Sequence, residues 1–101
     1  MSSICVSAVE GNGQMLDGGA MFGNAPRAVW EKWIPPDEQG RIPLACRALL
    51  VEIDNKKILC ETGIGAFFEP KLAERFGVQT PQVHQLLVNL KKMGIAAKDI
   101  D

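Results

Sequence analysis

The 101-residue sequence predicts an α+β fold in which helices flank a mostly antiparallel sheet. Three observations predict this class. Short β-prone segments are separated by turn residues, other segments carry apolar residues at helical spacing, and 47% of the residues are hydrophobic against 23% charged. That composition is ordinary for a globular domain and excludes a disordered chain. The length favours one domain, residues 1–101.

The first element expected is a β-hairpin. Residues 4–9 alternate between two faces, and residues 14–17 follow as a second, shorter strand. Gly11, Asn12 and Gly13 lie between them, and glycine and asparagine tolerate the positive φ angles of tight turns. These two strands are therefore predicted to pair with each other.

A helix is predicted over residues 24–34. Asn24 can cap its first turn, a proline follows at a favourable position, and Trp30 and Trp33 share a face with a valine at helical spacing. Two consecutive prolines prevent continuation of this helix. Residues 35–41 show no periodicity and are predicted to form an exposed loop.

Residues 44–53 are the most β-prone stretch of the chain. A turn at Asp54 and Asn55 follows, and residues 57–61 are predicted to return antiparallel. Both strands carry apolar residues on both faces, which predicts a sheet covered on both sides. The predicted helices supply less cover than that, so an isolated chain is expected to expose an apolar patch and an unpaired sheet edge.

Two helices are predicted towards the C-terminus. Residues 69–76 have a proline in the first turn and end at Gly77. Residues 80–93 carry apolar side chains at i, i+3, i+4, i+7 spacing, with lysines in the last turn and a glycine cap. The stripe comprises Val83, Leu86, Leu87, Leu90 and Met93. Leu87, at its centre, is predicted to be a core residue.

Charge and hydropathy argue against two classes of partner. The net charge is −1 and the basic runs are two lysine pairs, so neither nucleic acid nor a membrane surface is an expected partner. No stretch approaches the roughly 18 apolar residues that a membrane span needs, and the N-terminus has no signal-peptide pattern. Three cysteines, odd in number and set among apolar or β-prone residues, predict buried free thiols in a reducing cytoplasm.

Few side chains in the chain suggest catalysis. The glycine-rich stretches lack the spacing of dinucleotide and phosphate loops, which favours tight turns. Cys5, Cys46, Cys60 and His84 would make a Cys₃His zinc set, but no two lie closer than fourteen residues, whereas structural zinc sites use close pairs. His84 has no partner in sequence for acid–base or nucleophilic catalysis. The sequence therefore predicts neither a catalytic residue nor a metal ligand here.

Three motifs, taken in order, resemble a known family. They are LDGGAMFG at residues 16–23, WEKWIPPDEQGRIPLACRALLVEI at residues 30–53 and ILCETGIG at residues 58–65. The chain resembles the N-terminal half of a metallo-β-lactamase-fold hydrolase, closest to the lactonase-like bacterial branch. The resemblance implies one half of an αβ/βα sandwich. In that family, zinc or a related ion activates a water that attacks a lactone, ester or amide.

The resemblance also implies a missing partner. Residues 99–101, Asp-Ile-Asp, resemble the lead into the strand before the metal-binding His-x-His-x-Asp-His loop, so every metal ligand would lie beyond Asp101. The chain alone is then expected to hold no cofactor. Zinc would belong to the complete domain, completed by a complementary C-terminal half, with a small lactone or ester as substrate.

Five residues acquire implied roles from this resemblance. Glu61 stands where the family carries the aspartate of Asp-Thr-Gly, whose carboxylate orients the ligand loop; the side chain is one methylene longer, and Thr62 and Gly63 match. Glu61 acting as a plain strand-end cap stays open. Phe22 and Trp30 resemble hydrophobic positions at the pocket mouth, with core packing as the alternative.

Two functional hypotheses follow. The first is the N-terminal part of a metal-dependent hydrolase, inactive by itself. The second is a free-standing α+β module that binds a partner and catalyses nothing.

Overall fold

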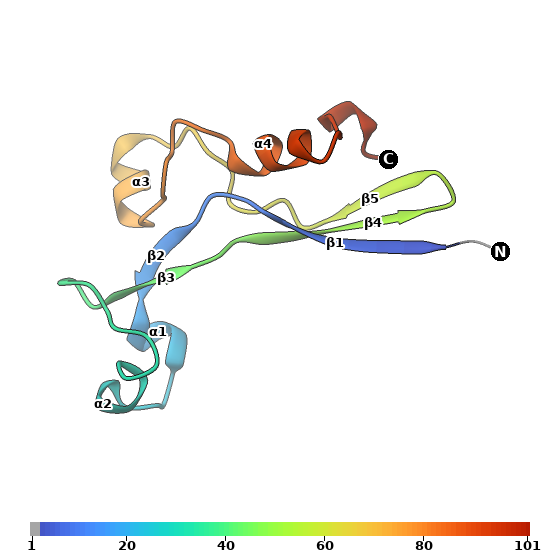
Figure 1. Cartoon of the computed structure of the whole chain (residues 1–101). Helices are drawn as coiled ribbons and strands as arrows, with labels where there is room; N and C mark the ends of the chain where they lie inside the picture. The colour runs from blue at the N-terminus through green and yellow to red at the C-terminus, as the bar shows by residue number, and fades with distance from the viewer. Residues whose placement is uncertain (1–2) are drawn as a thin grey trace.

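The larger sheet of the molecule has three antiparallel strands. A computed structural model describes residues 3–101 (Figure 1). In it β1 (Ile4–Glu10) pairs with β4 (Arg47–Ile53), and β4 pairs with β5 (Lys56–Cys60), so the order is β1-β4-β5. The α+β class with a mostly antiparallel sheet is confirmed.

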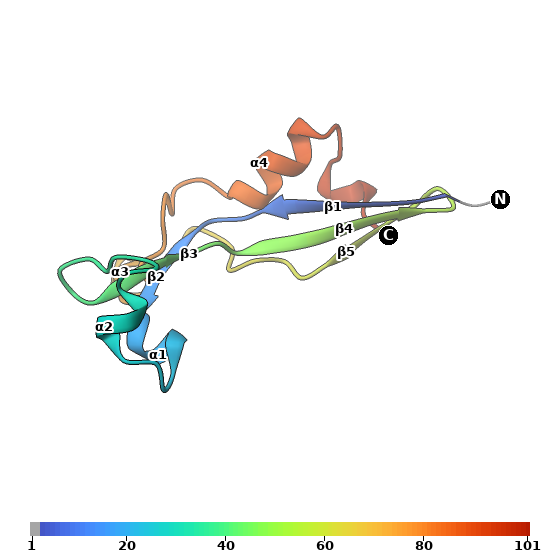
Figure 2. The same cartoon turned by 60° about the horizontal axis from the view of Figure 1, so that its bottom comes forward.

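A smaller sheet continues the first one beyond a bend. β2 (Gln14–Asp17) pairs with β3 (Arg41–Leu44). Between the two ladders, three residues, 11–13, lie opposite two, 45 and 46. An extra residue in one strand bends an antiparallel ribbon. β1–β2 and β3–β4 therefore form one long bent ribbon, as Figures 1 and 2 show.

The predicted N-terminal hairpin is wrong, although both of its strands exist. β1 and β2 pair with β4 and β3, not with each other. Gly11 N–H donates to Cys46 O at 2.8 Å, so the glycine-rich segment stays beside the neighbouring strand instead of reversing direction. Glycine and asparagine permit a bulge as readily as a turn, and the sequence signal does not separate the two.

The second predicted hairpin is confirmed. β4 and β5 pair antiparallel, and Asp54 and Asn55 have φ angles of 50° and 64°, as a tight two-residue turn requires. The strand predicted over residues 44–53 is divided by residues 45 and 46, because the ribbon bends there.

The core lies between the larger sheet and α4 (Gln85–Lys92), which covers one sheet face in Figures 1 and 2. Its buried members are Val9, Ala48, Leu50, Leu86, Leu90 and Ile95. Leu50 is 0% exposed and Leu90 1%. A short 3₁₀ helix (Ala97–Asp99) follows α4 and brings Ile100 against this cluster.

The C-terminal helix differs from its prediction in start and in orientation. α4 begins at Gln85, and His84 caps it, because Nδ1 accepts from Leu87 N–H at 3.4 Å. Leu86 and Leu90 are buried as predicted. Leu87 is 43% exposed, so its assignment to the core is wrong. Successive helical residues point about 100° apart, and the sheet meets the Leu86–Leu90 side.

The helix predicted over residues 24–34 is confirmed only for α2 (Arg27–Trp30). Turns follow α2, so the predicted shared face is broken: Trp30 is 3% exposed but Trp33 is 64% exposed. A further short helix, α1 (Gly18–Phe22), was not predicted. Asp17 caps α1 by accepting a hydrogen bond from the backbone N–H three residues later.

The helix α3 matches its prediction, but the predicted exposed loop over residues 35–41 is confirmed only in part. Arg41 already belongs to β3, and Gly40 is buried. In the loop, Asp37 accepts the backbone N–H and the Nε–H of Arg41. These bonds, the backbone one first, hold the pKa of Asp37 below its usual value. α3 (Pro70–Arg75) begins with proline, and Gly77 follows it at φ 58°.

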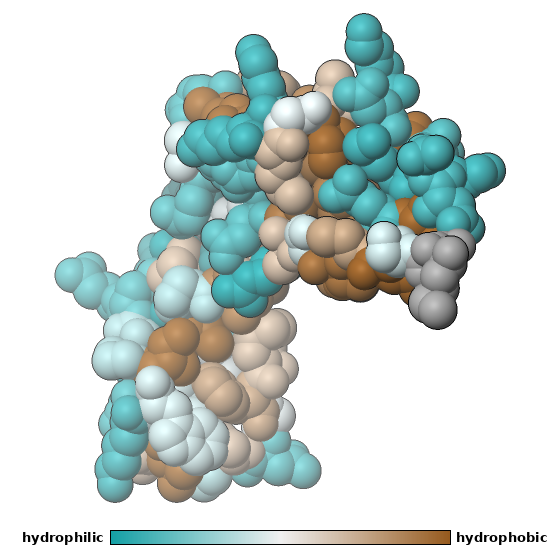
Figure 3. Space-filling view, turned by 45° about the vertical axis from the view of Figure 1, so that its right-hand side comes forward, coloured by the Kyte–Doolittle hydropathy of each residue, from teal (hydrophilic) through white to brown (hydrophobic). Residues whose placement is uncertain are grey.

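The middle of the sheet face opposite α4 is apolar, and no helix of the described chain lies over it. Strand register places on this face Ile4, Val6, Ala8, Leu49, Val51, Ile53, Ile58 and Cys60, with the charged residues Glu10, Arg47 and Lys56 at its two ends. Four of them are 42–63% exposed: Leu49 42%, Ile58 44%, Val6 56% and Ile4 63%. Figure 3 shows hydrophobic side chains gathered beside the grey N-terminal residues, on the side of the sheet away from α4.

The cysteines correct one prediction. Cys5 and Cys60 are exposed and Cys46 is half-buried, and all three are free thiols. Buried thiols were expected because cysteine is usually a core residue. Cys60 lies on the uncovered face and Cys5 near the end of the sheet. None of the helices in the described part of the chain is long and apolar enough to cross a membrane.

Candidate functional site

Glu61, Thr62 and Gly63 follow directly after β5. Glu61 has φ 76° and Gly63 φ 69°. Side chains larger than glycine rarely adopt this left-handed region, so Glu61 carries backbone strain. Its Oε1 accepts the Thr62 N–H at 2.9 Å, and the residue is exposed. A strained, exposed acidic residue is a candidate for function.

A small open cavity lies beside these residues. It has a volume of about 250 Å³ and is lined by Ala45, Cys46, Arg47, Glu61, Gly63 and Ile64. The bend in the ribbon thus meets the segment after β5. Two of its polar groups are already engaged: Cys46 Sγ accepts from Gln14 Nε2 at 3.5 Å, and Arg47 Nε lies 3.0 Å from Glu10 Oε1. The Glu61 carboxylate keeps capacity to accept hydrogen bonds from another element.

The donor set of this site does not fit a metal ion. The cavity offers one carboxylate and one thiol, whereas a protein metal site needs three or four ligands. Across residues 3–101, no group of three or more His, Cys, Asp or Glu side chains comes together. Cys5 and Cys60 lie on opposite faces of the sheet by register, and His84 Nδ1 caps α4.

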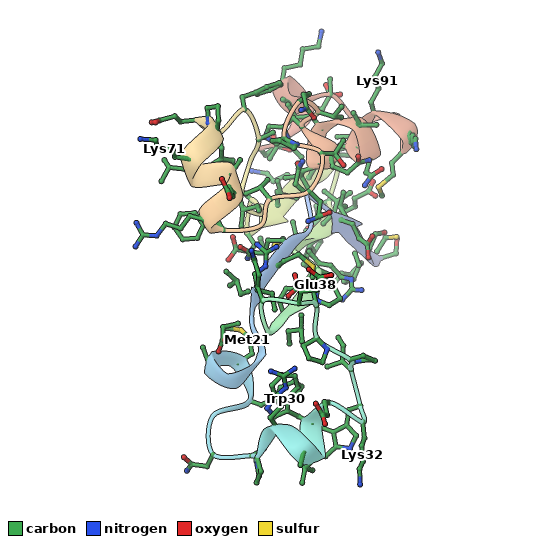
Figure 4. All side chains as sticks on the ribbon, turned by 90° about the vertical axis from the view of Figure 1, so that its left-hand side faces the viewer. Met21, Trp30, Lys32, Glu38, Lys71 and Lys91 are labelled. Atoms are coloured by element: carbon green, nitrogen blue, oxygen red, sulfur yellow. The ribbon has the colours of Figure 1, made fainter. Side chains whose placement is uncertain are left out.

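Phe22 and Trp30 form an aromatic cluster in another part of the molecule. Their rings stack with centroids 5.3 Å apart and an interplanar angle of 14°. Trp33 packs against Phe22 at 5.7 Å, and the Arg27 guanidinium lies 5.9 Å from the Trp30 ring centroid. Figure 4 shows Trp30 in the α1–α2 unit, away from α3 and α4. The structure therefore does not bring these rings together with Glu61.

Gly18 is required by the packing of Trp30. A Cβ at Gly18 would lie 2.4 Å from Trp30 Cη2, and Trp30 cannot move freely because it is buried against Phe22. Gly18→Ala should lower the free energy of unfolding by about 1–3 kcal/mol, as overpacked cores do. Urea unfolding measures the loss. Gly13→Ala is the matched control, since its Cβ would make contacts of 3.5 Å or longer. Equal losses in both variants would contradict the packing assignment.

Asn12 is a buried polar residue whose role the sequence did not indicate. It is 3% exposed. Its Nδ2 donates to three backbone carbonyls, those of Gln79 at 3.0 Å, Thr80 at 3.0 Å and Val83 at 2.8 Å. Its Oδ1 accepts the Gln85 N–H at 2.9 Å. Asn12 thus fixes the ribbon bend to the segment that leads into α4. A glycine on each side was the available signal, but it suggested a turn.

The outer edge of β5 already receives one extended residue. Asp101 N–H donates to Lys57 O at 2.8 Å, and Lys57 N–H donates to Asp101 Oδ2 at 2.8 Å. Backbone groups alternate along a strand, so those of Leu59 also point away from β4. Beside this edge, Leu59, Thr62, His84, Leu86, Leu87, Leu90, Ala97 and Ile100 line a groove of about 300 Å³. Among residues 3–101, no strand pairs with this edge beyond the contact with Asp101.

Comparisons with known proteins give one informative match. No protein-family model and no curated protein matches the chain. A solved structure does, the crystal structure of a probable metal-dependent hydrolase from Staphylococcus aureus. It is 28% identical, with a TM-score of 0.86, and the match covers 97% of this chain and 35% of that one. This chain therefore spans about a third of the length of the hydrolase to which it is similar.

Proposed function

We propose that this chain is the N-terminal part of a metallo-β-lactamase-fold, metal-dependent hydrolase domain, acting on a lactone, ester or amide once complete. The similarity over 97% of this chain to 35% of a probable metal-dependent hydrolase supports the proposal. On this proposal the chain alone is not catalytic. A complementary C-terminal part supplies the ligands for zinc or a related ion.

The observation that carries the proposal is the uncovered sheet face. Ile4, Val6, Leu49 and Ile58 are 42–63% exposed on one surface. The charged residues of that face, Glu10, Arg47 and Lys56, stand at the two ends of the sheet in the register. A soluble monomer rarely leaves a whole sheet face of this kind in water, because burying it gives roughly 25 cal/mol per Å². A second sheet packed against it is the arrangement that a two-sheet sandwich provides.

The edge of β5 supports the same partner. Lys57 uses its C=O for Asp101 N–H and its N–H for the Asp101 side chain. An antiparallel neighbour would instead bond to both groups of Lys57 with its backbone. Because the Lys57 N–H is already occupied by the Asp101 side chain, a neighbouring strand parallel to β5 is favoured. The next backbone carbonyl of that strand would face the N–H of Leu59. Such a strand would lie over the groove beside α4 and leave the sheet near Glu61.

In the proposed complete domain, Glu61 supports the catalytic site without contacting the reacting atoms. Its carboxylate can accept hydrogen bonds from the loop after the added strand and so orient that loop. Thr62 and Gly63 shape the turn that presents it. A bound divalent ion in the complete domain would polarise the substrate carbonyl or activate water. The three free thiols fit a reducing compartment, and we propose the cytoplasm.

Coexpression tests the proposal. The 101-residue chain is produced with a polypeptide that carries the His-x-His-x-Asp-His loop and the second sheet, for example the remaining two thirds of the similar hydrolase. The two should copurify and hydrolyse a chromogenic ester or a lactone in a zinc-dependent way, whereas neither alone should do so. Ile58→Asp on the uncovered face should prevent assembly, and Lys71→Asp on α3 should not.

One result would contradict this function. If the purified 101-residue chain is a monomer with a sharp cooperative melt and binds no hydrophobic dye, its apolar face needs no partner. A complex without zinc-dependent hydrolysis would instead favour the non-catalytic α+β binding module, to which the same exposed face also points.

A further inference from the structure

Asn12 is distinguished by the residue that follows it. The chain has four asparagines, and among them only Asn12 precedes a glycine. In an Asn-Gly pair the next backbone nitrogen can approach the side-chain carbonyl carbon easily, because glycine has no Cβ to obstruct it. Ring closure between these atoms is the chemistry by which asparagine loses its amide.

In the folded chain, hydrogen bonds hold the Asn12 amide and the backbone on both sides of it in place. The Asn12 amide makes four hydrogen bonds of 2.8–3.0 Å and the residue is 3% exposed. The flanking backbone is fixed as well: Gly11 N–H donates to Cys46 O, and Gly13 O accepts the Gln79 N–H, each at 2.8 Å. The rotation that would bring Gly13 N onto Asn12 Cγ breaks several of these bonds together.

We propose that Asn12 is a deamidation site that folding protects and that unfolding exposes. Deamidation at Asn12 then marks chains that have lost these hydrogen bonds irreversibly. In the opened chain, Gly13 N attacks Asn12 Cγ. The Cγ–Nδ2 bond breaks, the amide nitrogen takes the proton lost from Gly13 N and leaves as ammonia, and a five-membered imide forms. Water then opens the imide at either carbonyl and gives an aspartyl or an isoaspartyl linkage. No oxidant, metal or enzyme is needed.

The products cannot restore the native contact. A carboxylate has no donor for the carbonyls of Gln79, Thr80 and Val83, and its negative charge faces three acceptors. The isoaspartyl product also lengthens the backbone at the bulge by one methylene. Unfolding therefore becomes irreversible once this step has occurred, because the chemically modified chain cannot return to the native state. The inference rests on these contacts and is independent of the hydrolase proposal.

Mass spectrometry tests the proposal. The chain is incubated in mildly alkaline buffer with and without concentrated urea, and peptides containing Asn12 are followed for a gain of about 1 Da. Deamidation should be at least about tenfold slower without urea, because folding protects Asn12 from the reaction. After the urea is removed, the deamidated fraction should remain susceptible to protease while the unmodified fraction regains protection. Isomerisation at Asp17-Gly18 leaves the mass unchanged and does not interfere.

Gly13→Ala is the matched control. Its Cβ would contact Leu44 O at 3.5 Å and Gln79 Cγ at 3.8 Å, so the variant should fold like the parent. In urea it should deamidate several-fold more slowly, because the methyl group hinders ring closure. The proposal is overturned if the parent deamidates equally fast with and without urea, or if the deamidated chain refolds as well as the unmodified one.

Discussion

Leu90→Ala should lower the free energy of unfolding by about 2–5 kcal/mol. Leu90 is 1% exposed. Its side chain lies on the face of α4 that packs against the larger sheet, in the cluster that contains Leu50 and Val9. Removing its side chain loses apolar transfer energy and leaves a cavity that close-packed neighbours fill only in part. Denaturant unfolding followed by circular dichroism measures the change.

Leu87→Ala is the control, because it removes the same atoms from the same helix. Leu87 is 43% exposed, so the isolated chain should lose about 1 kcal/mol or less. The two losses should be clearly different in the chain alone. In an assembly whose added strand covers the groove beside β5, Leu87→Ala should become costly too. A larger loss for Leu87→Ala than for Leu90→Ala in the isolated chain would mean that α4 faces the other way.

Asn12→Asp should destabilise the chain by an amount on the order of 3–5 kcal/mol at neutral pH, the cost of leaving a buried charge without a partner. The introduced carboxylate would face three carbonyl oxygens that now receive hydrogen bonds from Nδ2. Thermal or urea unfolding measures it. Asn24→Asp makes the same change of charge at an exposed position and should stay within about 0.5 kcal/mol of the parent.

The pH dependence of the Asn12→Asp variant gives a second check. Burial and three facing acceptors favour the neutral form, so the introduced carboxyl should have a higher pKa in the folded than in the unfolded chain. Its destabilising effect should therefore shrink as the pH falls, since the protonated group can again donate one hydrogen bond. A deficit that grows on acidification would show that the carboxylate had found a cationic partner.

The candidate site was accessible to sequence reasoning only in outline. The motif resemblance singled out Glu61, Thr62 and Gly63. Glu61 and Gly63 line the cavity beside Cys46, whereas Thr62 lines the groove beside α4. The local sequence does not indicate the φ angle of 76° at Glu61, because glutamate favours other regions of φ/ψ space. Asn12 was missed for a related reason: four of its partners lie 67 or more residues away along the chain.

Local sequence patterns predict the α+β class, the β4–β5 hairpin, the helix near Pro70 and an amphipathic helix that contains Leu86 and Leu90. Each depends on residues a few positions apart, such as a two-residue turn or a 3.6-residue period. Contacts between distant parts of the chain set the pairing of β1 with β4, the packing of Trp30 on Gly18 and the exposure of Leu87 to the groove beside β5. These outcomes depend on which distant surfaces of the chain meet. The hydrophobic effect is non-directional, so a local sequence pattern does not specify which surfaces those are.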